Sequence, residues 1–245
     1  MLEGLRTAAA GMAAQQSKLD AVANDLANAN TTGYKRVRVG FADLLYDQGG
    51  RPTAPGVTVG HGARAVQTGR GFQQGNLRET GNPLDVAIQG EGFIRVRLSD
   101  GRQALTRDGG LHLDGTRRLV TSTGALVQPQ ITVPQGISES AISISRNGTV
   151  TADGRTLGRI ELVTVRSPAG LLSAGENAFV ATAASGNPAA APESTVLTQG
   201  ALEGSNTDMA SAMVEMIEAQ RTYQLTSKAI QTADQMMEIA NGVKR

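Results

Sequence analysis

The last forty residues repeat apolar side chains every seven positions, and this repeat constrains the fold more than any other feature. Large side chains lie seven apart, and a small side chain follows each of them three positions later. This a/d spacing predicts an amphipathic helix whose stripe packs closely against another helix. The predicted C-terminal assembly seam comprises Met209, Ala212, Met216, Ala219, Tyr223, Ile230, Ala233 and Met237.

The first thirty residues carry a second stripe of the same kind. Apolar residues recur at spacings of three and four, with Gln15 as the single polar member. The pattern predicts a helix that ends between residues 28 and 33, where Gly33 suits a left-handed cap. The predicted N-terminal assembly seam comprises Leu5, Ala8, Met12, Leu19, Val22 and Leu26.

Neither stripe can be buried by its own helix, because isolated helices gain most of their stability from packing. We expect the two terminal helices to pair with each other, with helices of other subunits, or with both.

The middle of the chain has a different residue pattern. Short runs of β-forming residues alternate with dipeptides that favour tight turns. These dipeptides are Asp100–Gly101, Asp108–Gly109, Asp114–Gly115, Asn147–Gly148 and Asp153–Gly154. Residues 72–200 are therefore predicted to form an antiparallel β domain, with an exposed, mobile link at residues 181–192.

The predicted fold class is α+β, with long coiled-coil-forming helices flanking the central antiparallel β domain. The expected organisation is an N-terminal amphipathic helix at residues 1–30, an extended connector at 31–71, the β domain at 72–200, and a C-terminal coiled-coil helix at 201–245.

Composition excludes several classes of partner. The formal net charge is +1, so there is no long-range field to gather nucleic acid. Aromatic residues make up only 3% of the chain, which is poor material for a small-molecule pocket. There is no cysteine, and therefore no disulfide or thiolate chemistry. No apolar run reaches the length of a membrane span, and the first residues lack the pattern of a cleaved signal peptide.

The sequence offers no catalytic, cofactor or metal site. The two histidines, His61 and His112, lie in unrelated segments, and His112 is expected to face solvent from a strand. Residues 60–65 match a dinucleotide-binding pattern, but the helix that should follow is missing. The Asp–Gly pairs lack the spacing of a calcium loop. We expect a protein that is not an enzyme.

Three blocks of sequence carry a family resemblance. The first comprises Asn24, Leu26, Ala27, Asn28, Thr31, Gly33, Tyr34 and Lys35, with Asp25 where a second Asn is usual. The second spans residues 74–93 and continues at 106–109. The third begins at residue 202, includes Ser205 and Asn206, and continues with Gln220 and Arg221. In this order the blocks resemble the bacterial flagellar rod and hook proteins. Length and the run at residues 129–134 resemble the distal-rod branch most.

The resemblance implies a structural subunit that polymerises into a helical tube, transmits motor torque to the hook and encloses an export channel. It implies partners in further copies of the chain, other rod subunits, the hook protein, the flagellar type III export apparatus and a surrounding ring or bushing. The implied location is the basal body outside the cytoplasmic membrane, reached without a cleaved signal peptide. The alternatives are a proximal-rod or hook-type paralogue, and a coiled-coil-dimerised β-domain binding module.

Overall fold

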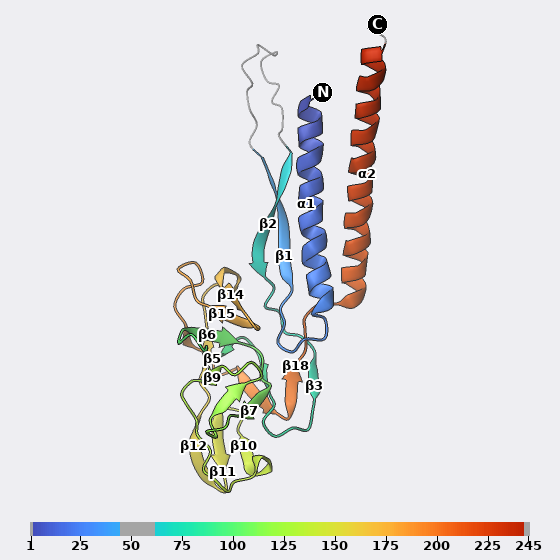
Figure 1. The fold of residues 1–245 in the computed structure, drawn as a ribbon. Coiled ribbons are helices and arrows are strands. Elements are labelled where there is room, and N and C mark those ends of the chain that lie inside the picture. The colour runs from blue at the N-terminus through green and yellow to red at the C-terminus, as the bar shows by residue number, and fades with distance from the viewer. Residues whose placement is uncertain (1, 45–61, 243–245) are drawn as a thin grey trace. The chain divides into compact units, whose positions relative to one another are not determined.

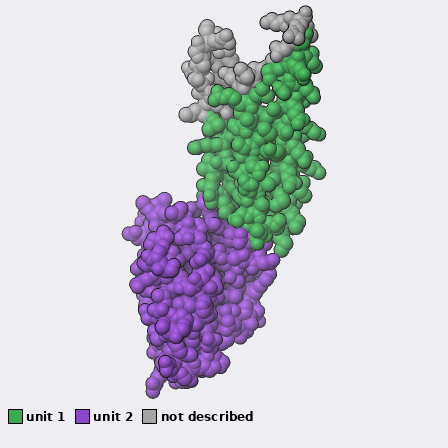
Figure 2. Space-filling model, in the orientation of Figure 1, with its two compact units in different colours: residues 1–27, 37–68, 208–245 green, residues 28–36, 69–207 purple. Residues whose placement is uncertain are grey.

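The chain, described as a computed structural model over residues 2–44 and 62–242, divides into two compact units. Unit 1 contains residues 1–27, 37–68 and 208–245, and unit 2 contains residues 28–36 and 69–207 (Figure 2). The helices belong to unit 1 and most of the strands to unit 2. This is an α+β chain, as the sequence predicts.

Unit 1 contains two long helices and a two-stranded sheet. Helix α1 (Leu2–Ala27) has 26 residues and helix α2 (Met209–Gly242) has 34, and they lie side by side in opposite directions (Figure 1). Strands β1 (Val37–Asp43) and β2 (Ala63–Arg70) pair with each other. Asp25 of α1 accepts a hydrogen bond from the Val37 backbone N–H at 3.0 Å. An Asn at this position would offer the same acceptor, so the departure at Asp25 keeps this contact.

Helix α1 ends within one residue of the predicted range, whereas the predicted C-terminal helical domain at 201–245 divides into a strand and a helix. Helix α1 ends at Ala27, before a turn that includes Gly33 at φ 66°. Helix α2 begins at Met209, not at residue 201. Residues 201–203 form a strand instead, and Asp208 starts the helix because its side chain accepts the Ser211 backbone N–H at 2.7 Å.

The predicted extended connector is partly regular structure. Strands β1 and β2 occupy residues 37–43 and 63–70 of the range 31–71, and both run mainly within unit 1. The rest of that prediction, at residues 45–61, lies outside the described residues, as does the start of the dinucleotide-like pattern and His61.

Unit 2 is built from short antiparallel strands. The largest sheet has the order β14-β15-β6-β5-β9-β8-β7, and β13 joins it through β5 and also pairs with β16. The smaller sheets are β10-β11-β12, β17-β4 and β18-β3. The strands are β3 (Leu77–Glu79), β4 (Val86–Gln89), β5 (Phe93–Arg97), β6 (Gln103–Thr106), β7 (Leu111–Leu113), β8 (Leu119–Thr121), β9 (Leu126–Val127), β10 (Ile142–Ile144), β11 (Thr149–Ala152), β12 (Arg155–Arg159), β13 (Leu162–Thr164), β14 (Leu172–Gly175), β15 (Ala178–Val180), β16 (Ala189–Ala190), β17 (Val196–Gln199) and β18 (Ala201–Glu203). Two 3-10 turns, Glu139–Ala141 and Pro168–Gly170, complete it.

The core of unit 2 is aliphatic, with one small aromatic cluster. Branched side chains from at least eight strands form the larger cluster, which includes Ile88, Ile94, Ile131 and Ile160. Phe72, Phe93 and Phe179 pack edge to face, with ring centroids 5.1 to 6.4 Å apart. Such edge-to-face pairs add stability beyond the area they bury. Three of the four Phe residues of the chain are used here.

Four of the five predicted turns are confirmed. Asp100–Gly101, Asp114–Gly115, Asn147–Gly148 and Asp153–Gly154 each join two paired strands. The fifth prediction is wrong. Asp108 is only 4% exposed, and the strands on either side of Asp108–Gly109, β6 and β7, do not pair. Contacts with segments that are distant in the sequence determine the conformation of Asp108 and Gly109.

The link predicted at residues 181–192 is more ordered than expected. It contains strand β16, and the side chain of Ser185 is fully buried. The Thr182 hydroxyl accepts the Ser185 backbone N–H and donates to the Gly170 carbonyl oxygen at 2.7 Å. Local hydrogen bonds of this kind hold a segment that is rich in Ala, Gly and Ser.

Candidate functional site: a helix seam and a buried junction of chain-end segments

The heptad stripe of α2 supplies the side of the helix that α1 covers. Ala212 is 7% exposed and Ala219 is 1% exposed, and they are the only buried side chains among those described in α2. Met216, Ile230, Ala233 and Met237 are partly buried, whereas Met209 and Tyr223 are 47% and 40% exposed. The small members of the stripe therefore lie closest to α1, and the large members flank them.

The stripe of α1 shows the same gradation. Val22 is 6% exposed, and Leu5, Ala8, Met12, Leu19 and Leu26 are partly buried. The most buried side chain of α1, Ala14 at 4%, was not among the predicted seam residues. Ala14 lies outside the a and d positions of the heptad series. Its small side chain is the one local sign that another segment approaches α1 closely at this point.

Helix α2 carries a second apolar face that the heptad pattern did not reveal. Apart from the adjacent pair Met213 and Val214, its members lie three, four, eight or eleven residues from another member, on the side of the helix away from Ala212 and Ala219. All are at least half exposed: Met213 at 50%, Val214 at 56%, Ile217 at 50%, Leu225 at 68%, Met236 at 54% and Ile239 at 67%. We call these six residues the open face of α2.

Inside unit 2, the segments that follow α1 and precede α2 in the sequence run together. The Gly33 backbone N–H donates to the Glu203 carbonyl oxygen at 2.8 Å, and Asn206 N–H donates to the Tyr34 carbonyl oxygen at 3.4 Å. The Arg36 N–H donates to the Asn206 side-chain oxygen at 2.8 Å. We call this contact of residues 33–36 with residues 203–206 the chain-end junction.

Three buried charges lie at the centre of the chain-end junction. The Lys35 Nζ is 2.6 Å from Glu203 Oε1, and both side chains are 0% exposed. The Arg107 Nε is 3.5 Å from Glu203 Oε2, and the Arg107 side chain is 3% exposed. Burial lowers the pKa of Lys35, since it disfavours the charged form, while the negative charge of Glu203 opposes this shift. Burial also lowers the pKa of Arg107.

Backbone groups satisfy most of the remaining polar atoms of these charges. Lys35 Nζ donates to the Gln73 carbonyl oxygen at 2.8 Å, and the Gly75 N–H donates to Glu203 Oε1 at 2.8 Å. Arg107 donates to the carbonyl oxygens of Phe72 and Gly90. Arg107 Nε and Glu203 Oε2 face each other without a hydrogen bond. The carboxylate thus lies between two cations and contacts three other chain segments, through Lys35, Gly75 and Arg107.

The predicted motif residues divide among the end of α1 (Asn24, Leu26, Ala27), the turn after it (Asn28, Thr31), the chain-end junction and α2. The Asn206 amide also donates to the Gly71 carbonyl oxygen at 2.6 Å, and Ser205 Oγ accepts the Thr207 N–H. Tyr34 is buried beneath the Arg70 guanidinium, 5.3 Å from the ring centroid. The Thr31 hydroxyl donates to the Asn28 side chain. Gln220 and Arg221 are exposed on α2, away from the chain-end junction in sequence.

Asp108 and Gly109 are held by contacts with distant segments, which explains why they do not form a hairpin. The Thr32 hydroxyl donates to Asp108 Oδ1 at 3.1 Å, and the Ser122 hydroxyl donates to Asp108 Oδ2 at 2.6 Å. A Cβ on Gly109 would overlap the carbonyl oxygen of Val86. Glycine is required here because two backbone segments touch.

The sequence analysis missed Arg107 and Glu203 as functional candidates. Glu203 lies 168 residues from Lys35, and nothing local marks it as a partner of that lysine. The only available signal was position, since Arg107 and Glu203 each fall within a block of the family resemblance.

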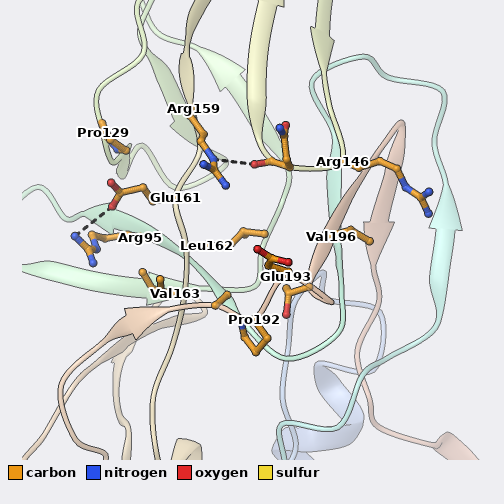
Figure 3. A pocket seen from close by; sticks show the side chains of 14 residues that line it. Arg95, Pro129, Arg146, Arg159, Glu161, Leu162, Val163, Pro192, Glu193 and Val196 are labelled. Carbon is orange, nitrogen blue, oxygen red and sulfur yellow. Dashed lines mark hydrogen bonds and ion pairs between the residues drawn. The ribbon is translucent and has the colours of Figure 1, made fainter.

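Unit 2 also has an open pocket of about 710 Å³ (Figure 3). Its charged lining residues are Arg95, Arg146, Arg159, Glu161 and Glu193, and Arg95 pairs with Glu161 at 3.4 Å. Arg159 Nε donates to the Asn147 carbonyl oxygen. Thr195 is the one hydroxyl residue that lines this pocket, and its hydroxyl donates to the Glu91 carbonyl oxygen at 2.8 Å and not to a base.

The described residues give little support for a metal site, a catalytic histidine or a membrane span. No group of three potential metal ligands comes together in residues 2–44 and 62–242. His112 is exposed on β7, as predicted. Within the same ranges, neither helix is long and apolar enough to cross a membrane.

Three family descriptions match separate parts of the chain. Residues 5–35 match "Flagella basal body rod protein", residues 87–152 match "Flagellar hook protein FlgE/F/G D1 domain", and residues 198–243 match "Flagellar basal body rod FlgEFG protein C-terminal". The first and third of these ranges contain the chain-end segments that meet at Lys35 and Glu203.

Relatives of similar length match this chain from end to end. The flagellar basal-body rod protein FlgG of Borreliella burgdorferi is 44% identical, with all of both chains covered. The proteins of the same name from Caulobacter vibrioides and Bacillus subtilis are 40% and 35% identical, over 99% and 100% of this chain and all of each relative.

Proposed function

Since this chain belongs to the family of flagellar basal-body rod and hook proteins and is a structural subunit of the rod, we propose that it polymerises into a helical tube. In this tube the terminal helices form a coiled-coil inner layer around an export channel, and unit 2 lies outside. The predicted seams on α1 and α2 hold the helices of one subunit together, and the open face of α2 contacts further subunits.

The open face of α2 is the observation that carries this proposal. Six large apolar side chains along one helix are at least half exposed, and apolar surface left open in this way on a soluble protein marks an interaction site. Because α1 already covers the opposite side of α2, the open face needs a partner from outside the chain. A second copy is the economical partner, because repeated contacts between identical subunits generate a helical polymer.

Stiffness follows from the number of such contacts. Each subunit would be held by several neighbours at once, so no single weak contact has to carry the load. A shaft of this kind transmits torque from the motor to the hook. The relatives named FlgG support a distal position in the rod, with other rod subunits and the hook protein as neighbours and a ring as a surrounding bushing.

The route to this location is export through the flagellar type III apparatus without a cleaved signal peptide. The rod lies outside the cytoplasmic membrane, so each subunit has to leave the cytoplasm before it assembles. The near-neutral net charge and the lack of cysteine are compatible with passage into an oxidising compartment.

The proposal is tested by electron microscopy of basal bodies from a strain that lacks this gene. We expect rods that stop in their distal half and carry no hook. Rods that stop next to the membrane would instead indicate a proximal subunit. Complete rods with hooks, together with normal motility, would contradict the proposal and favour the binding module.

A further inference from the structure

We propose that Lys35, Arg107 and Glu203 are positioning residues, which hold the segments leading to α1 and α2 together and thereby promote the pairing of the two helices. This role concerns the single subunit. Its consequence for the polymer rests on the function proposed above, whereas its test does not.

The three charges lie where the chain-end junction closes. Glu203 binds Lys35 through one carboxylate oxygen and faces Arg107 with the other. Through its backbone carbonyl oxygen it also binds Gly33, two residues before Lys35. Asn206 adds the contacts to Tyr34 and Arg36. Residues 33–36 and 203–206 are therefore joined by side-chain and backbone contacts together.

Burying charges is a costly way to stabilise a domain. A buried ion pair contributes little compared with well-packed apolar residues of similar size, because desolvation offsets the attraction. The core of unit 2 elsewhere is aliphatic and has no need of such a pair. What the charges add is selectivity: removing Lys35 leaves a buried carboxylate short of a partner, so only the correct pairing of the two segments is tolerated.

The chain-end junction lies close in sequence to both helices. Helix α1 ends at Ala27, a few residues before Gly33, and α2 begins at Met209, soon after Asn206. With the junction open, β3 and β18 still pair, but α1 is then joined to this pair only through the roughly 50 residues between Ala27 and β3, and closing such a loop costs entropy. With the junction closed, short tethers raise the effective concentration of one helix near the other.

The contact between α1 and α2 needs the short tether that the closed chain-end junction supplies. Among the side chains described in the two helices, the buried apolar ones are only Ala212 and Ala219 on α2 and Ala14 and Val22 on α1. Small side chains bury little apolar area, so the pair by itself is weakly held. A loss of the tether is therefore expected to separate the helices.

Spin labels test this inference on the full chain at a concentration where it is monomeric. The chain contains no cysteine, so Ala23→Cys and Ser211→Cys introduce the only two label positions. Both side chains are exposed, one near the end of α1 and one near the start of α2. Pulsed electron paramagnetic resonance then reports the distribution of distances between them.

We expect a narrow distribution in the labelled parent and one about twofold broader in Lys35→Met, because the tether is lost. Lys35→Arg keeps the positive charge and should keep the distribution narrow. Val150→Ala is the matched control, because it weakens the core of unit 2 at a residue that is 1% exposed and outside the chain-end junction. Methyl resonances of the core isoleucines show whether unit 2 is folded.

A narrow distribution in a folded Lys35→Met, or equal broadening in Val150→Ala, would overturn the inference. If Lys35→Met does not fold, Glu203→Gln gives the same readout with a smaller change of shape. Unfolding of unit 2 in both variants, with Val150→Ala intact, would show that the charges serve stability alone. Because the measurement uses monomers, each result is independent of whether the chain forms a rod.

Discussion

Replacing Leu225 on the open face of α2 is expected to weaken assembly of the polymer while leaving the folding of the monomer unchanged. It is 68% exposed in the subunit, so replacing it should leave the stability of the monomer within about 0.5 kcal/mol. Burying a whole leucine side chain contributes about 2 kcal/mol, and the exposed two-thirds of Leu225 therefore offers about 1.4 kcal/mol to a neighbour. That amount corresponds to a tenfold change in an equilibrium constant.

We expect Leu225→Ala to raise the concentration required for rod assembly about tenfold. Leu225→Glu should block assembly, because it also buries an unpaired carboxylate in the contact. The control is Gln220→Glu, which adds the same charge at an exposed position about 140° away around the helix axis. Circular dichroism checks that each monomer is folded, and electron microscopy of basal bodies from cells carrying each variant counts complete rods.

The reasoning would be refuted if Leu225→Glu built rods of normal length and number. It would equally be refuted if Gln220→Glu and Leu225→Glu had the same effect, because the apolar face would then be irrelevant.

Two further predictions concern unit 2. Gly109→Ala should lower the free energy of unfolding by at least about 3 kcal/mol, because the added Cβ meets the Val86 carbonyl oxygen, whereas Gly115→Ala, where a Cβ meets nothing within 4 Å, should change it little. Urea unfolding measures both, and equal effects would contradict the close approach at Gly109. Asp114 accepts the backbone N–H groups of Thr116 and Arg118, which hold its pKa below the usual 3.8. Its ionised form is therefore favoured by folding, and this stabilisation is present above pH 3.8 and declines as the pH falls below it. Asp114→Asn should lower the urea midpoint at pH 7 and differ less from the parent near pH 2.5; a constant difference would show that charge is not involved.

Patterns that depend on neighbouring residues were predictable. The heptad stripe located α2, and the Asp–Gly and Asn–Gly pairs located four hairpins, because both signals act over fewer than ten residues. The start of α2 was misplaced for a tertiary reason. Residues 201–203 pair with β3 in an antiparallel ladder, and this distant contact fixes them as a strand.

Contacts between segments that lie far apart in the sequence could not be predicted from the sequence. Asp108–Gly109 has the composition of a hairpin turn, yet Thr32 and Ser122 bind its carboxylate and Val86 packs against its glycine. Glu203 was not distinguishable from other acidic residues until the fold placed it beside Lys35. The open face of α2 was visible in the spacing of its residues, but only the position of α1 shows which apolar stripe is left uncovered.

The unequal lengths of the two helices have a consequence for how subunits join end to end. Helix α2 is eight residues longer than α1, which corresponds to about 12 Å of helix. Its last two turns project past the beginning of α1, and they carry Met236 and Ile239 of the open face (Figure 1). The described part of α2 therefore continues beyond the described part of α1, and its last two turns have no cover from that helix. A chain shortened by these turns would keep most of its own helix pair, lose Met237 of the seam, and lose the part of the open face by which it overlaps the next subunit.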